Sequence, residues 1–192
     1  MKKPANWENV KATAPSMSLP KGAYAIKIMG AKEEIYKDKS GREFSKLAIS
    51  FDIAEGEYKD FYANQWRSQT QEDKKWKGVY RIYCPKDDGT PEDARTQSNF
   101  KAFIDSVEGS NSGYHWDWNP NTLKDKAVGC IFRLEEYDFN GYNGWSTRPV
   151  YCITIEKLKS GEFKLPNDKP LKIEADTQHS AADVIDDGDL PF

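Results

Sequence analysis

Cysteine is scarce in this sequence, and long apolar segments are absent. Its three cysteines, Cys84, Cys130 and Cys152, are too few and too widely spaced for a disulfide framework or a CxxC metal site. No apolar run approaches the roughly 20 residues that a membrane-spanning helix needs. The first residues are polar and lack the apolar stretch of a secretory signal. We therefore expect a cytoplasmic protein without membrane association.

The sequence also lacks the patterns of common catalytic sites. It has only two histidines and no Gly-rich phosphate loop, GxSxG or HExxH motif. Two pairs of adjacent glutamates, Glu33-Glu34 and Glu135-Glu136, fall in predicted strands. Neighbouring side chains of a strand face opposite sides of the sheet, so neither pair suits a two-carboxylate site. We expect no enzymatic activity, no cofactor and no metal ion.

The net charge is only −3, which at first argues against a nucleic-acid partner. The charge is unevenly distributed, however. Residues 175–192 hold five of the 31 acidic residues and none of the 28 basic ones, so the rest of the chain carries a net charge of +2. A mildly basic body with an acidic tail is typical of a protein whose body binds an anion.

Apolar residues alternate with polar ones along much of the chain, which predicts antiparallel β-structure. A polar turn at 37–42 joins the first two predicted strands, and two Asn-Gly pairs between 139 and 145 favour a hairpin between the last two. Strands are expected over residues 23–28, 46–53, 79–84, 128–134 and 151–155, and 57–66 is a candidate sixth strand.

One helix is predicted to begin after Thr90, which can cap its N-terminus, with Pro91 at the first helical position and Gly109 as its end. Its apolar stripe consists of Phe100, Phe103, Ile104 and Val107. Five or six strands with one helix before the last pair predict a mainly β fold, a small antiparallel barrel. We expect a loosely ordered arm over 1–19, the folded domain over 20–166 and a disordered acidic tail over 167–192.

Aromatic residues lie beside basic ones in several segments of the predicted barrel. Single-stranded nucleic acid is bound by this combination, because cations hold the backbone while aromatic faces stack on bases. The predicted stacking residues are Tyr36, Phe44, Trp66, Trp76, Tyr83, Tyr142 and Trp145. The predicted phosphate-binding residues are Lys37, Lys39, Arg42, Arg67, Arg81 and Arg148. The alternative, that these aromatic side chains fill the barrel, remains open for each of them.

The acidic tail ends in Leu190-Pro191-Phe192, which is apolar and carries the terminal carboxylate. A tail that serves only to keep the protein soluble has no need of such an end. In a docking tail, Phe192 would enter an apolar pocket of a partner, and the aspartates would steer the approach. A solvated terminus without a partner is the alternative.

The tail is similar to the acidic tip of bacterial single-stranded-DNA-binding proteins, an Asp run followed by an apolar residue, Pro and Phe. The matching residues are Asp186, Asp187, Asp189, Leu190, Pro191 and Phe192, with Gly188 interrupting the run. The body resembles the divergent versions carried by phages of Gram-positive bacteria, in the segments 49–53, 55–57 and 110–117. The resemblance implies an oligonucleotide-binding (OB) fold whose ligand crosses the middle strands between loops 37–43 and 139–148. For a phage protein, the cytoplasm would be that of the host.

These observations together predict sequence-independent binding of single-stranded DNA by the barrel, and recruitment of replication or recombination proteins by the tip. Two other classes of function remain: a carbohydrate-binding β-domain of the secreted type, and an adaptor that binds only proteins. The sequence leaves open the choice between DNA and RNA, and whether the protein forms a homo-oligomer.

Overall fold

The computed structural model of the 192-residue chain describes residues 2, 3, 5, 18–139 and 141–171. The strands are β1 (Gly22–Lys37), β2 (Glu43–Ile53), β3 (Val79–Tyr83), β4 (Ala127–Phe139) and β5 (Tyr142–Ile153). The helices are α1 (Phe61–Ser68), α2 (Pro91–Ser110), α3 (Ile155–Ser160) and a short 3-10 helix, η2 (Pro120–Leu123). None of the described helices is long and apolar enough to cross a membrane.

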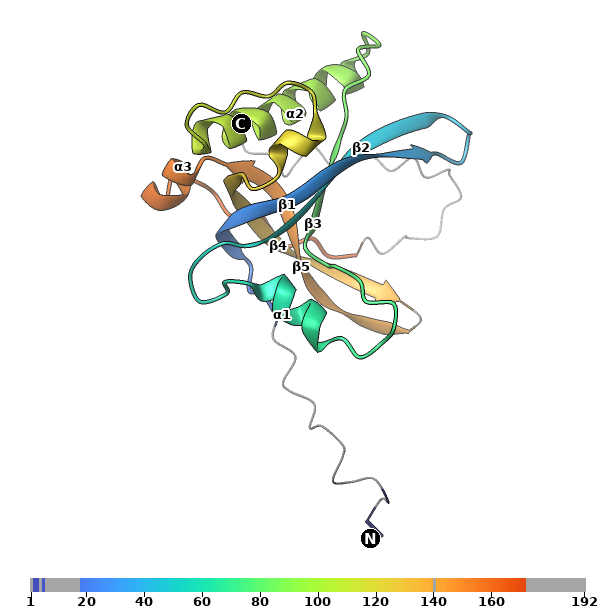
Figure 1. The fold of residues 1–192 in the computed structure, drawn as a ribbon. Coiled ribbons are helices and arrows are strands. Elements are labelled where there is room, and N and C mark those ends of the chain that lie inside the picture. The colour runs from blue at the N-terminus through green and yellow to red at the C-terminus, as the bar shows by residue number, and fades with distance from the viewer. Residues whose placement is uncertain (1, 4, 6–17, 140, 172–192) are drawn as a thin grey trace.

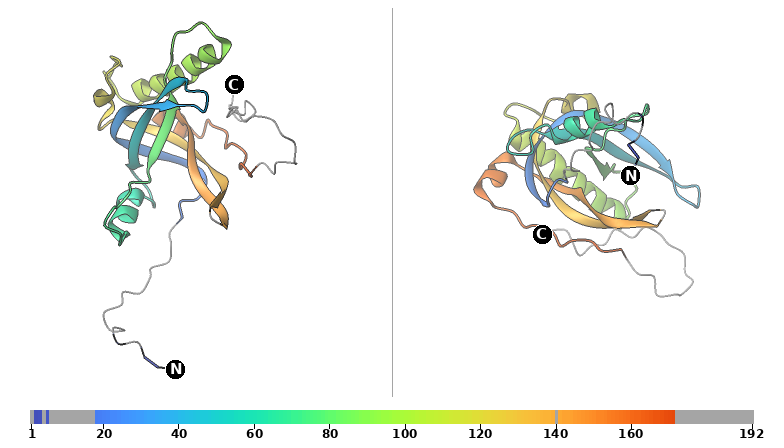
Figure 2. Two further views of the ribbon diagram at one scale, coloured as in Figure 1. Left: turned by 90° about the vertical axis from the view of Figure 1, so that its right-hand side faces the viewer. Right: turned by 90° about the horizontal axis from the view of Figure 1, so that it is seen from below.

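The five strands form one antiparallel sheet in the order β3-β2-β1-β4-β5, with α2 inserted between β3 and β4 (Figures 1 and 2). Each end strand, β3 or β5, is paired on one side only. The curled sheet is therefore open along the line where these two edges approach each other. A five-stranded, partly open barrel is the architecture of the OB fold. The predicted fold class is confirmed as mainly β and OB-like.

The β1–β2 hairpin forms where the alternating pattern predicts it. Leu47, Ile49, Phe51 and Ile53 of β2 are almost completely buried. The β1–β2 register shifts between Ile28 and Gly30, which places a bulge at Met29. Beyond the bulge, β1 continues to Lys37, so the hairpin extends well past the core.

The predicted helix is also confirmed. The Thr90 hydroxyl accepts a hydrogen bond from the Asp93 N–H, and Pro91 occupies the first turn. Gly109, the expected end, instead lies inside the last turn, where a side chain would collide with Thr154. Asn111 ends the helix, and its side-chain amide donates to Val107 at 2.7 Å.

The candidate strand over 57–66 is wrong, because this segment forms a turn followed by α1. The buried carboxylate of Asp52 accepts hydrogen bonds from the backbone N–H groups of Tyr62 and Ala63, and so satisfies the first turn of the helix. Phe61 and Tyr62 then enter the core. The prediction of a single helix is also wrong, because α1, η2 and α3 are present in addition to α2.

The folded part extends beyond the predicted limits of 20 and 166. Leu19 is only 4% exposed, and its carbonyl accepts a hydrogen bond from the Thr147 hydroxyl. At the other end, Lys169 pairs with Glu135, and Asp168 forms a 2.7 Å ion pair with Lys21. The segment 167–171, assigned to the tail by the sequence, therefore lies against the folded domain, with Lys169 bridged to β4. The tip, residues 186–192, lies outside the described residues.

Candidate functional site

Three strands bring a set of aromatic residues together on the outer face of the sheet. The register places Tyr36 opposite Phe44, and Lys46 opposite Tyr83. The Tyr36 and Phe44 rings stack with centroids 5.5 Å apart, and Phe44 and Tyr83 are 5.7 Å apart. The Lys46 ammonium lies over all three rings, 4.3 Å from the Tyr83 centroid. We call Tyr36, Phe44, Lys46 and Tyr83 the platform.

The Glu34 carboxylate organises the polar side chains beside the platform. It accepts a 2.6 Å hydrogen bond from the Tyr36 hydroxyl and forms ion pairs with Lys32 at 3.0 Å and Arg81 at 3.1 Å. These donors lower the pKa of Glu34 to about 2, so the carboxylate stays ionised near neutral pH. Arg81, a predicted phosphate-binding residue, is thus held in place by an acidic neighbour.

The β1–β2 loop is ordered by Asp38 in a similar way. Its carboxylate accepts hydrogen bonds from Ser40 and from both the backbone N–H and the guanidinium of Arg42. These donors hold the pKa of Asp38 well below its ordinary value. Lys37 pairs with Glu43 at 3.1 Å. Of the three predicted cations of this hairpin, only Lys39 has no ion pair with another described residue.

The β4–β5 hairpin presents its aromatic side chains to solvent. Phe139 and Tyr142 at its end are 70% and 77% exposed, and Trp145 is 48% exposed. Arg148 is exposed farther along β5 and forms no ion pair within the described part of the chain. Both long hairpins extend beyond the core on the same side of the molecule, with β3 between them (Figures 1 and 2). We call the surface between the two hairpins, which includes the cleft described next, the groove.

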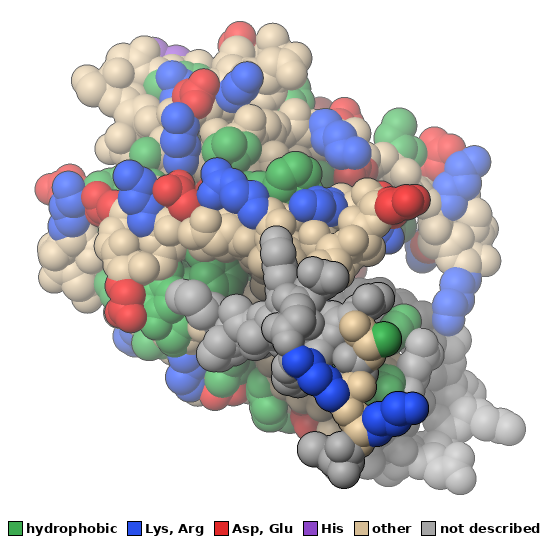
Figure 3. All heavy atoms as spheres, turned by 60° about the horizontal axis from the view of Figure 1, so that its bottom comes forward, with side chains coloured by type: hydrophobic (Ala, Val, Ile, Leu, Met, Phe, Trp, Pro, Cys, Tyr) green, Lys and Arg blue, Asp and Glu red, His purple; other side chains and the backbone are tan. Residues whose placement is uncertain are grey.

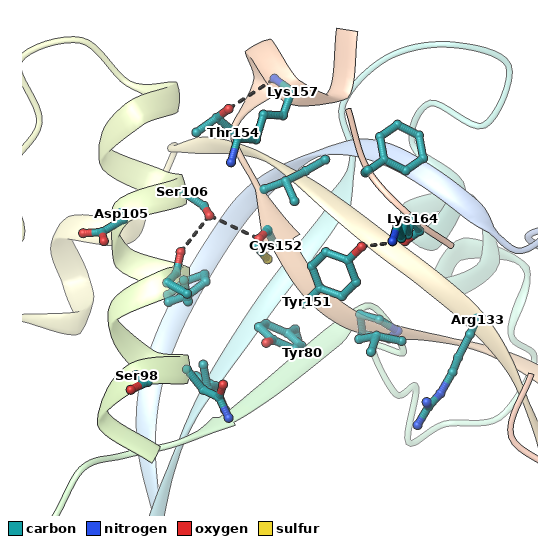
Figure 4. A pocket seen from close by; sticks show the side chains of 18 of the residues that line it. Tyr80, Ser98, Asp105, Ser106, Arg133, Tyr151, Cys152, Thr154, Lys157 and Lys164 are labelled. Atoms are coloured by element: carbon teal, nitrogen blue, oxygen red, sulfur yellow. Dashed lines mark hydrogen bonds between the residues drawn. The ribbon is translucent and has the colours of Figure 1, made fainter. Parts of the chain in front are cut away.

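A cleft of about 1150 Å³ adjoins the platform. It lies between the free edges of β3 and β5, with α2 on one side and residues 161–164 on the other (Figure 4). Arg81 and Tyr83 line it, so it is continuous with the platform. Tyr80 and Tyr151 come from the two strand edges and lie on the two sides of the opening.

The described residues on the face of the molecule seen in Figure 3 form no concentrated patch of positive charge. On the face seen in Figure 3, Lys and Arg side chains alternate with Asp and Glu side chains. Within the candidate site, Glu34, Asp38 and Glu43 each form an ion pair with Lys or Arg as well. A ligand held here would gain more from the exposed ring faces than from excess positive charge.

Three predicted site residues lie apart from this groove. α1 follows the end of β2 opposite to the β1–β2 loop, and it carries Trp66 and Arg67. Trp66 is 40% exposed with the Lys74 ammonium 5.0 Å from its ring, and Arg67 donates to Asn64. Trp76 packs against the core, and its indole N–H donates to the carbonyls of Phe51 and Gly78. Trp76 has a structural role in this position.

Sequence reasoning missed Glu34, Lys46 and the cleft. The alternation of Glu34 with Tyr36, and of Phe44 with Lys46, indicates that each pair shares a face of its strand. That signal could have added both charged residues to the site. The cleft could not be found in this way, because its lining residues come from segments spread from Tyr80 to Lys169 along the chain.

No group of histidine, cysteine, aspartate and glutamate side chains suited to a metal ion occurs in the described residues. No model of a known protein family matches this chain, and no curated protein is significantly similar to it in sequence.

Proposed function

We propose that this protein binds single-stranded DNA along the groove between the β1–β2 and β4–β5 hairpins. The observation that carries the proposal is the platform, three neighbouring rings under one ammonium group, which continues into the cleft between the strand edges. Unpaired bases offer a π-face whatever their sequence, so stacking at about 1–3 kcal/mol per base suits binding without sequence preference.

The basic side chains along the groove favour nucleic acid over carbohydrate as the ligand. Arg81 stands beside the platform, Lys39 lies in the β1–β2 loop and Arg148 is on β5. A sugar chain would use the rings but would gain nothing from these cations. The same cations also favour the proposal over the alternative of an adaptor that binds only proteins. The barrel of such an adaptor would not bind an oligonucleotide.

The ion pairs of the groove also suggest how phosphates are accommodated. Glu34 forms an ion pair with Arg81 at 3.1 Å, and Asp38 forms one with Arg42 at 2.8 Å. A phosphate would share these cations with the carboxylates or displace them. Binding would therefore depend on salt, but less steeply than in a groove with uncompensated cations.

The C-terminal tip would recruit proteins of replication or recombination to the coated strand. This part of the proposal rests on residues 186–192, which lie outside the described residues. Deletion of residues 183–192 is expected to abolish recruitment and to leave DNA affinity equal or higher, because an acidic segment that would compete with DNA for the basic side chains is removed. Weaker DNA binding after the deletion would contradict this role.

Titration of the intrinsic tryptophan fluorescence with oligo(dT) tests the proposal. We expect quenching that saturates, and an affinity that falls with salt at a log–log slope of about −0.7 for each phosphate contacted. The same titration with oligo(U) tests binding of RNA, and the titration with a soluble polysaccharide of matched length tests binding of carbohydrate. Quenching by the polysaccharide but not by oligo(dT) would exclude the proposal.

A further inference from the structure

The cleft between β3 and β5 contains polar groups that the fold itself does not use. Tyr80 is only 8% exposed and lines the cleft, but its hydroxyl has no hydrogen-bond partner among the described residues. Burial holds the pKa of this hydroxyl above its ordinary value, so it remains a donor at neutral pH. Asn99 of α2 also lines the cleft, and its side-chain amide makes no hydrogen bond within the described chain. The Tyr80 hydroxyl and the Asn99 amide are therefore free to bond to a ligand that enters the cleft.

The walls of the cleft provide flat surfaces around these polar groups. Tyr151 of β5 and Phe163, which follows α3, line it together with Tyr83. Tyr151 is fixed in position because its hydroxyl donates to the Lys164 carbonyl at 2.6 Å. Tyr151 is therefore held by the fold, and the three rings line the space that a planar group would enter.

Several basic side chains line the cleft. Arg81 lies at the border with the platform, and Lys157 and Lys164 lie near α3. Arg133, which is almost fully buried, is bonded to Glu135 at 3.1 Å. The cleft thus offers the neutral polar groups of Tyr80 and Asn99 together with basic side chains, of which Arg133 and Arg81 are paired with carboxylates. A ligand with a planar neutral part and flanking phosphates fits this arrangement.

We propose that the cleft binds one nucleobase, turned out of the strand that lies in the groove, with the Tyr80 hydroxyl and the Asn99 amide contacting its edge. This inference rests on the proposed function and extends it from stacking to selection among bases. A hydroxyl and an amide can each donate and accept, so they can pair with the Watson–Crick edge of a base. The volume of about 1150 Å³ exceeds the 300–1,000 Å³ typical of ligand pockets, so space does not prevent entry.

An extended peptide added between the two strand edges is the competing occupant. Such a strand would need free backbone groups on both edges. On β5, the Cys152 carbonyl already accepts a hydrogen bond from the Ser106 hydroxyl at 3.1 Å, and Pro149 has no N–H. The register also shifts around Val150, which further disrupts this edge. These features of the β5 edge favour a nucleobase over an added peptide strand as the occupant of the cleft.

Binding of labelled deoxyoligonucleotides of one length, made of dT, dC, dA or abasic units, tests this inference by fluorescence anisotropy. We expect the wild-type protein to distinguish among the three bases. Tyr80→Phe removes only the hydroxyl and should reduce the affinity for the preferred base about two- to tenfold, the range for one hydrogen bond. It should leave the abasic oligomer and the salt slope unchanged. Tyr58→Phe, outside the cleft, is the matched control and should change nothing.

A second variant fills the cleft from its side. Ala102 is exposed on α2 and lines the cleft, so Ala102→Trp obstructs it without entering the core. It should remove the difference among the bases and preserve the affinity for the abasic oligomer.

Equal binding of all three bases, unaffected by either variant, would overturn the base pocket while leaving the proposed function intact. An acidic extended peptide that displaces DNA from the wild type but not from Ala102→Trp would assign the cleft to a strand and also overturn it. Absence of any DNA binding would overturn both proposals.

Discussion

The β1–β2 and β4–β5 hairpins present the same residue types in two different ways. On β1–β2, Phe44 is stacked against Tyr36, and Arg42 is bound to an acidic residue of its own loop. On β4–β5, Trp145 is half exposed and Arg148 forms no ion pair with another described residue. One hairpin is organised by contacts within the protein, and the other leaves its side chains available to a ligand.

This difference has an energetic consequence. Side chains that are already ordered lose little entropy on binding, but their faces and charges are partly used before a ligand arrives. Exposed side chains lose more entropy and gain the full contact. We therefore expect the β4–β5 hairpin to contribute most of the binding energy, and the β1–β2 hairpin to set the position of the strand.

The largest effect is expected from removal of both exposed rings of β4–β5. The double variant Tyr142→Ala/Trp145→Ala should lose about 2–6 kcal/mol of oligo(dT) binding, since each ring stacks on a base at about 1–3 kcal/mol. Urea unfolding should be almost unchanged, because neither ring lies in the core. Trp118→Ala is the control, since Trp118 is 70% exposed but lies outside the cleft and platform, stacked on Phe100. An equal loss of oligo(dT) binding in Trp118→Ala would refute the assignment of Tyr142 and Trp145 to the binding site.

Phe44→Ala should affect stability as well as binding. It removes two ring contacts, each worth about 0.5–1.5 kcal/mol beyond the area buried. We expect the free energy of unfolding to fall by about 1–3 kcal/mol, measured by urea titration, and DNA affinity to fall with it. If DNA binding falls while the free energy of unfolding is unchanged, the platform is not organised by contacts within the protein before DNA binds. The proposed difference between the two hairpins would then be wrong.

Glu34→Gln tests whether ion pairs within the protein limit DNA binding. Loss of the carboxylate frees Arg81 and Lys32 to contact phosphates, so the log–log salt slope should steepen by about 0.7 for each new contact. Glu33→Gln is the matched control, because it removes the same charge from the opposite face of β1. A steeper slope in both variants would indicate a general charge effect rather than release of Arg81.

The smallest effect concerns stability at low pH. The pKa of Glu34 is lowered in the folded state from 4.5 to about 2, so its contribution is fully present above pH 4.5 and is lost as the pH falls through 2. In the wild type, unfolding free energy should decline over this window more steeply than in Glu34→Gln. Parallel pH profiles for the two proteins would show that the ion pairs of Glu34 do not contribute to stability.

Much of the site was predictable from local pattern. The platform rings Tyr36 and Phe44 flank a polar turn, and the position of Tyr83 follows from the alternation of β3. Trp76 could not be assigned in this way. Its neighbours Lys75 and Lys77 suggested a base-stacking residue, whereas the carbonyls that accept its N–H come from β2 and from Gly78 in the fold.

Periodicity in the sequence determined the five strands, the long helix and the two hairpins, because alternating burial and helix capping act between residues close in the chain. Tertiary structure alone decided that 57–66 includes a helix, since the carboxylate that satisfies its first turn is supplied by Asp52 of β2. It also decided which cations are neutralised and where the cleft opens. Both depend on distances between residues far apart in the chain, such as Glu34 and Arg81, which no local pattern contains.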